Sequence, residues 1–129
     1  MGNRAVIQFG RSKKSPAIYL HWNGGIESVQ AFLDVAKDLG CRADDYGVAR
    51  LAQIIGNFFG GTLCIGVDRA ENLDRDNFDN GTFVVKDWKI VKRLFVPDYR
   101  INETMDMVYY QGVYDEAMRI NKPIFGKTE

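Results

Sequence analysis

A strand that runs into a glycine turn and then into a helix constrains the fold of this chain most. Residues 17–22 (AIYLHW) alternate apolar and polar side chains with a period of two, which is typical of a half-buried β-strand. The glycine turn, residues 23–25 (NGG), ends this strand. From Ile26 to about Leu39 apolar residues recur at steps of three and four, which predicts an amphipathic helix directly after the turn.

The rest of the chain is organised in blocks of strands and helices. The order β-β-α-α-β-β-β-α predicts an α+β domain with a mainly antiparallel sheet of about five strands and two or three helices packed on one face. The first two strands are expected to form a hairpin, and residues 79–81 (DNG) are expected to form a tight turn between the third and fourth strands. The expected strands are residues 5–9, 17–22, 62–67, 82–85 and 88–96, and the expected helices are 26–39, 46–59 and 103–120.

Length and charge restrict the class of partner. The 129 residues suit a single domain over 1–129, with an ordered core at about 3–120 and a tail at 121–129 that contains Pro123. The 17 basic and 17 acidic side chains balance, so general electrostatic binding of nucleic acid is not expected. No apolar run approaches the roughly 18 residues of a membrane span, and no signal peptide precedes the first strand. We therefore expect a cytoplasmic protein without membrane contact.

The glycine turn is the first candidate site. Helix N-termini carry unpaired N–H groups and a partial positive charge, and Gly24 and Gly25 permit close approach of a small anion such as a phosphate. Ser28 falls in the first helical turn, where its hydroxyl could assist. No Walker lysine is present, and Glu27 would repel an anion. A turn with purely structural hydrogen bonds is the alternative.

The strand before the turn carries a row of polar side chains. Tyr19, His21 and Asn23 share one face, whereas Ile18, Leu20 and Trp22 are expected to face the core. The row suits contact with a polar ligand or a partner, and a histidine can also serve in acid–base chemistry. No nucleophile is placed beside His21 by the sequence, so no catalytic residue is assigned. A structural hydrogen-bonding role is the alternative.

The expected second helix carries a polar stripe on an otherwise apolar surface. Arg50, Gln53 and Asn57 follow one another at steps of three and four and therefore share a face. Buried amides and guanidinium groups need hydrogen-bond partners. The stripe therefore predicts either structural hydrogen bonds or a polar pocket shared with the row at Tyr19, His21 and Asn23.

Charged segments later in the chain do not predict a metal or nucleic-acid site. The acidic segment 68–79 fails the spacing of a calcium-binding loop, and its arginines would compete with a cation. It is expected to be a solvated loop or a protein-contact surface that imitates phosphate charge. The basic and aromatic residues of 83–95 are explained more simply by an amphipathic strand with solvated lysines. No metal or cofactor is expected, and nucleic acid is an unlikely partner.

Three segments together resemble a family of small proteins from phages, prophages and other mobile elements of bacteria. They are residues 17–25, with a YLHWNGG-type motif, residues 49–61 and residues 79–91. The resemblance extends from Asn3 to about Leu94 and is weak in the helix after Pro97. It implies an accessory protein in the cytoplasm of a bacterial host, and it supplies no catalytic residues.

Three functions follow from these patterns and this resemblance. The first is a non-enzymatic accessory protein that binds a host protein, with inhibition of host defence, as by an anti-CRISPR protein, as its role. The second is a small-ligand or nucleotide-binding protein, or a modest hydrolase, with its site at the glycine turn. The third is a phage structural or assembly component. The sequence shows neither the repeats nor the coiled coil that would favour it.

Overall fold

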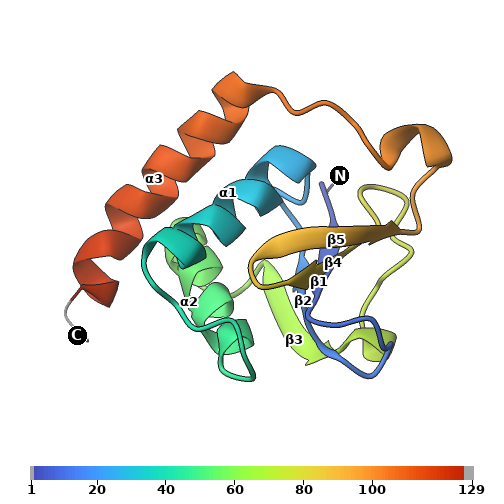
Figure 1. Ribbon diagram of the computed structural model, residues 1–129, viewed down its shortest axis with the longest axis horizontal. Helices are drawn as coiled ribbons and strands as arrows, with labels where there is room; N and C mark the ends of the chain where they lie inside the picture. The colour runs from blue at the N-terminus through green and yellow to red at the C-terminus, as the bar shows by residue number, and fades with distance from the viewer. Residues whose placement is uncertain (1, 127–129) are drawn as a thin grey trace.

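The computed structural model describes residues 2–126 and contains a five-stranded sheet and three helices (Figure 1). This arrangement confirms the predicted α+β fold and its element order. The elements are β1 (Ala5–Gln8), β2 (Pro16–Leu20), α1 (Ile26–Asp38), α2 (Gly47–Phe59), β3 (Ile65–Arg69), the 3-10 turn η1 (Ala70–Asn72), β4 (Thr82–Lys86), β5 (Lys89–Leu94), the 3-10 turn η2 (Asp98–Arg100) and α3 (Met107–Phe125).

The strands lie in the order β3-β2-β1-β4-β5. Three of the pairings are antiparallel, including the predicted β1–β2 hairpin, and β1 pairs with β4 in parallel. The tight turn predicted between β3 and β4 is therefore wrong, because β3 lies at one edge and β4 lies beyond β1. Segment 70–81 makes the crossover, and the Asn80 N–H donates to the Arg4 carbonyl at 3.1 Å to guide β4 alongside β1.

The helices lie on one side of the sheet (Figure 1). Helices α1 and α2 contact the strands, and α3 packs outside them against both helices. The opposite face of the sheet carries a smaller cluster of Val6, Ala17 and Ala70, packed with Tyr19 and Leu73. Within residues 2–126, no helix is both long and apolar enough to span a membrane. The largest fully buried side chains of the main core include Ile7, Ile18, Leu20, Phe32, Leu33, Leu51, Ile54, Ile55 and Phe83.

Helix α3 differs from its predicted boundaries at both ends. It begins at Met107, because the Asp106 carboxylate accepts hydrogen bonds from the N–H groups of Val108 and Tyr109 and caps the first turn. The helix continues to Phe125 and includes Asn121 and Pro123. The prediction of a tail from residue 121 is therefore wrong for residues 121–125. Residues 127–129 of that tail lie outside the described residues.

Trp22 does not occupy the core position that the alternating pattern predicted. Strand β2 ends at Leu20, residues 21–23 form a bend, and Asn23 has a positive φ of 56°, so Trp22 lies in the turn and not in the strand. The Trp22 side chain is 42% exposed, whereas Ile18 and Leu20 are fully buried as predicted. The alternating face therefore ends two residues earlier than expected.

Two tyrosines of α3 bind two carboxylates of α1. The Tyr110 hydroxyl donates to Asp34 Oδ2 at 2.5 Å, and the Tyr114 hydroxyl donates to Asp38. Burial and the bond to Asp34 raise the pKa of Tyr110, and the bond to Asp38 raises the pKa of Tyr114 to about 12. The helices are therefore joined by hydrogen bonds that require protonated phenols.

Alkaline pH is expected to weaken the contact between α1 and α3. Because folding raises the pKa of both phenols, their contribution is fully present below the ordinary value of about 10 and is lost as the pH rises toward 12. The denaturation midpoint of the wild type should approach that of the double variant Tyr110→Phe, Tyr114→Phe over this range. Urea unfolding measured across it tests this, and a difference that stays constant with pH would rule it out.

Candidate functional site

The polar row at the end of β2 is engaged within the protein. The Tyr19 hydroxyl lies 2.9 Å from His21 Nδ1, and burial raises the pKa of Tyr19. The His21 ring packs edge-on against Trp22, with ring centres 4.9 Å apart. On its other side the N-terminal segment is so close that a Cβ added to Gly2 would lie 2.9 Å from His21 Cε1. These contacts fit the structural alternative for His21.

Asn23 and Ser28 form a second, separate contact. Asn23 Nδ2 donates to Ser28 Oγ at 3.1 Å and to the Tyr109 hydroxyl at 3.3 Å. Ser28 is fully buried, so its hydroxyl is closed to solvent. The pair ties the glycine turn to α1 and to the first turn of α3. The Ser28 hydroxyl is therefore not available to assist an anion at the helix terminus.

Gly24 packs against the backbone that precedes β1. Its N–H donates to the Asn3 carbonyl at 2.8 Å, and an added Cβ would lie 2.5 Å from that same oxygen. Gly25 is the N-cap residue of α1 and has room for a side chain. Close by, Glu27 accepts a hydrogen bond from the Asp106 N–H at 2.9 Å. The turn is thus closely packed against the backbone before β1, and the carboxylate of Glu27 lies beside it.

Arg50 and Asn57 lie apart from the polar row. Arg50 donates to the Tyr46 carbonyl at 3.4 Å, and its guanidinium lies 5.5 Å from the centre of the Tyr46 ring. Asn57 accepts from Gln53 at 2.7 Å and donates to Asn121 at 2.8 Å. The structure therefore joins Tyr19 with His21 and Asn23 with Ser28, and it does not form the shared pocket that we considered.

Three carboxylates of the acidic segment pair with arginines. Asp79 accepts from Arg4 Nε at 2.7 Å, and this bond lowers the pKa of Asp79. Asp74 lies 3.7 Å from the same arginine, and Glu71 lies 3.5 Å from Arg69. Among residues 2–126, no group of three or more potential metal ligands is present. These contacts tie part of the segment to the fold, while Asp68 and Asp76 are exposed.

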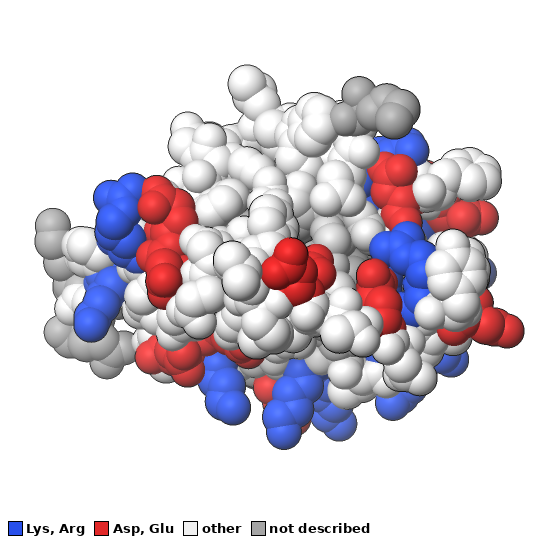
Figure 2. Space-filling view, turned by 90° about the horizontal axis from the view of Figure 1, so that it is seen from above, with Lys and Arg blue, Asp and Glu red and all other residues white. Residues whose placement is uncertain are grey.

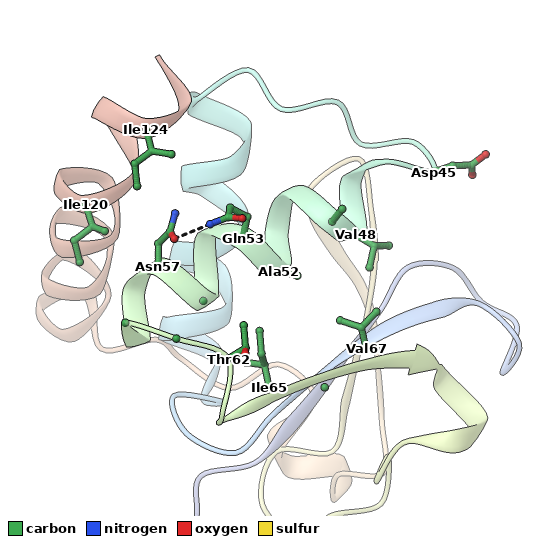
Figure 3. Close-up of a pocket in the computed structure, with 15 residues that line it drawn as sticks. Asp45, Val48, Ala52, Gln53, Asn57, Thr62, Ile65, Val67, Ile120 and Ile124 are labelled. Atoms are coloured by element: carbon green, nitrogen blue, oxygen red, sulfur yellow. Dashed lines mark hydrogen bonds between the residues drawn. The ribbon is translucent and has the colours of Figure 1, made fainter. Parts of the chain in front are cut away.

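The larger of two described cavities is an open groove between α2 and β3, with a volume of about 970 Å³ (Figure 3). Helix α2 forms one wall, β3 forms the facing wall, and the C-terminal part of α3 closes one end. Its lining is mainly apolar, with Asp45 at one end and Gln53 and Asn57 toward the other. The apolar side chains are Val48, Ala49, Ala52, Ile65, Val67, Ile120 and Ile124.

Small residues on α2 keep the groove open. Ala52 and Gly56 lie one turn apart on the wall of the helix that faces β3. A Cβ added to Gly56 would lie 3.6 Å from the Gly61 carbonyl oxygen, an ordinary contact, so close packing does not demand glycine there. These small residues are the sequence signal for the groove, which the polar motifs do not indicate.

Figure 2 shows charged side chains mainly at the two ends and the lower margin of this face, with an acidic group near its middle. Apolar side chains are exposed at the beginning of α3. Met107, Val108 and Tyr109 are exposed there by 56%, 85% and 48%. None of the three lines either of the two described cavities. The groove is the stronger candidate, because it combines apolar lining with a concave shape.

No protein-family model, curated protein or solved structure matches this chain. The candidate site therefore rests on the geometry of the chain itself.

Proposed function

We propose that this chain is a non-enzymatic binding protein, and that a protein partner occupies the groove between α2 and β3. The observation that carries the proposal is the open apolar groove itself. Contiguous exposed apolar surface is uncommon on soluble monomers and marks sites of interaction. Here the groove is bordered by β3, which lies at the edge of the sheet. An extended polypeptide can form hydrogen bonds with such an edge strand.

The chemistry of the groove supports binding rather than catalysis. Asp45 is the one ionisable side chain in its described lining, and a general acid–base pair requires a second group. His21 lies outside the lining and is held by Tyr19 and Trp22. The groove is open rather than enclosed, a shape that suits a chain segment better than a small molecule.

The resemblance to mobile-element proteins supports a particular setting for this partner. From it we infer a host protein in the bacterial cytoplasm, and interference with host defence as the role of the complex. The contacts of Asp74 and Asp79 with Arg4 leave fewer free carboxylates for phosphate imitation, which favours the groove as the means of recognition.

Replacing Ala52 with arginine is expected to remove partner binding. The long cationic side chain would occupy the middle of the groove and bring an unpaired charge to an apolar surface, which costs several kcal/mol of binding free energy when buried. Tagged wild type and variant should be compared by quantitative pull-down from bacterial lysate. We expect the recovered partner to fall about tenfold or more in the variant.

Gly112→Arg is the matched control for this experiment. It adds the same side chain to an exposed helix position, where a Cβ meets no atom within 4 Å. The control should retain the partner, and both variants should unfold at a temperature close to that of the wild type. Equal recovery by wild type and Ala52→Arg, or no specific recovery by the wild type, contradicts the proposal.

A further inference from the structure

Strand β3 forms one edge of the sheet, and its hydrogen-bonding pattern shows which groups face outward. In an antiparallel pair, alternate residues direct both backbone groups toward the partner strand. The His21 N–H donates to the Cys64 carbonyl at 2.9 Å, and the Ala70 N–H donates to the Ser15 carbonyl at 2.8 Å. The same register directs Gly66 and Asp68 toward β2. Ile65, Val67 and Arg69 therefore direct their backbone groups away from the sheet.

The ends of this outer edge are capped from within the chain. The Ile65 N–H donates to the Thr62 carbonyl at 3.2 Å, and the Arg69 N–H donates to the Asp68 carboxylate at 2.6 Å. Within residues 2–126, no such cap is found for the N–H of Val67, in the middle of the strand. The edge is thus protected against long strand pairing but retains an open donor and acceptor at Val67.

The side chain at this open position faces the groove. Val67 lies opposite Ile18, whose side chain is in the core beneath the helices, and Val67 itself is 56% exposed and lines the groove. Figure 3 shows Val67 and Ile65 on the strand below α2. Side chains directly opposite one another in a sheet lie on the same face. A residue paired with Val67 would therefore direct its side chain toward α2.

We propose that the partner contributes an extended segment that adds to β3 as a sixth strand and pairs with the backbone of Val67. This inference rests on the proposed function. The apolar walls select apolar side chains at alternate positions of the segment, which enter the groove with a period of two. Asp45 lies at one end with its carboxylate directed outward, so it favours a lysine or arginine where the segment leaves the groove.

The test uses a displayed library of random peptides, selected on the wild type and counter-selected on Ala52→Arg. Enriched peptides should alternate apolar residues and carry a basic residue at one end. The strongest peptide is then titrated calorimetrically into wild type, Val67→Pro and Val67→Ala. Proline removes the outward N–H and leaves the hydrogen bonds of Gly66 and Asp68 to β2 intact. Alanine removes more of the apolar side chain but retains the N–H.

We expect Val67→Pro to weaken peptide binding about tenfold, because one hydrogen bond is lost and its acceptor is left unpaired, whereas Val67→Ala should change affinity by less. Circular dichroism verifies that each variant is folded. Loss of binding in Ala52→Arg with unchanged binding in Val67→Pro overturns strand addition and leaves the proposed function standing. Failure of every peptide to distinguish Ala52→Arg from wild type overturns both.

Two other occupants are distinguished by measurements on the isolated protein. A dimer in sedimentation velocity that Val67→Pro dissociates would assign the edge to a second copy of this chain and overturn the proposal. A bound acyl chain in the native mass spectrum, displaced in Ala52→Arg, would do the same in favour of a small apolar ligand. A monomer of the unmodified mass is the result that the proposal predicts.

Discussion

Replacing Gly24 with alanine is expected to lower the free energy of unfolding by about 3 kcal/mol, because the added methyl group overlaps fixed backbone. Its Cβ would lie 2.5 Å from the Asn3 carbonyl oxygen and 2.8 Å from both the Arg4 carbonyl carbon and Ala5 Cβ. None of these atoms is the end of a flexible side chain, so the turn must move away from β1. Chemical denaturation of wild type and variant measures the loss directly.

Gly25→Ser is the control for the Gly24 variant. A Cβ at Gly25 meets only ordinary contacts, at 3.5 Å from Glu27 and 3.7 Å from Asn3, and serine is a favourable N-cap residue. We expect its stability to remain within about 0.5 kcal/mol of the wild type. Equal stabilities for the two variants would contradict the close packing of Gly24 against the backbone before β1.

Asn121→Ala is expected to destabilise the protein by about 2–3 kcal/mol, because it removes the hydrogen bonds of a buried side chain that joins α2 to α3. Asn121 is fully buried and donates to the Ala117 carbonyl at 2.8 Å and to the Ile54 carbonyl at 3.2 Å. It also accepts from Asn57 at 2.8 Å. Calorimetry should show a fall in melting temperature of about 10 °C for a chain of this size.

An exposed residue of α3 is the control for Asn121→Ala. Gln111 is exposed and donates to Asp115 at the surface, so Gln111→Ala should change stability by less than about 0.5 kcal/mol. The hydrogen bonds of Asn121 also keep Ile120 and Ile124 in position at the end of the groove. Loss of these bonds should therefore weaken partner binding as well. A melting temperature equal to that of Gln111→Ala would contradict the assigned role of Asn121.

Local periodicity predicted the elements well where local forces decide them. Helix α1 begins at Ile26 as expected, and Gly40, with a φ of 76°, follows its end. The parallel pairing of β1 with β4 was not predictable in this way, because it depends on contacts between distant segments, such as Asn80 with Arg4. The end of α3 was missed for the same reason, since burial of Asn121 against α2 outweighs the tail-like composition.

The sequence placed the polar residues near the turn on one face of a strand. Which contacts they make depends on the tertiary structure. Tyr19 and His21 do meet, whereas the buried hydroxyl of Ser28 and the packed backbone of Gly24 become visible only once β1 and α3 are in position. The groove joins α2 to β3 and to Ile120 and Ile124, and no local motif links these segments. Its sequence signal was a pair of small residues on α2, at Ala52 and Gly56.

Amide hydrogen exchange at Val67 tests the central claim most directly. The outward N–H of Val67 should exchange rapidly in the free protein and slow by about tenfold or more in complex with the recovered partner or a selected peptide. Amides of β5, at the opposite edge of the sheet, should keep their rates. Slowing at Val67 alone among these edges is the predicted result, and an unchanged Val67 rate in a saturated complex would contradict the account.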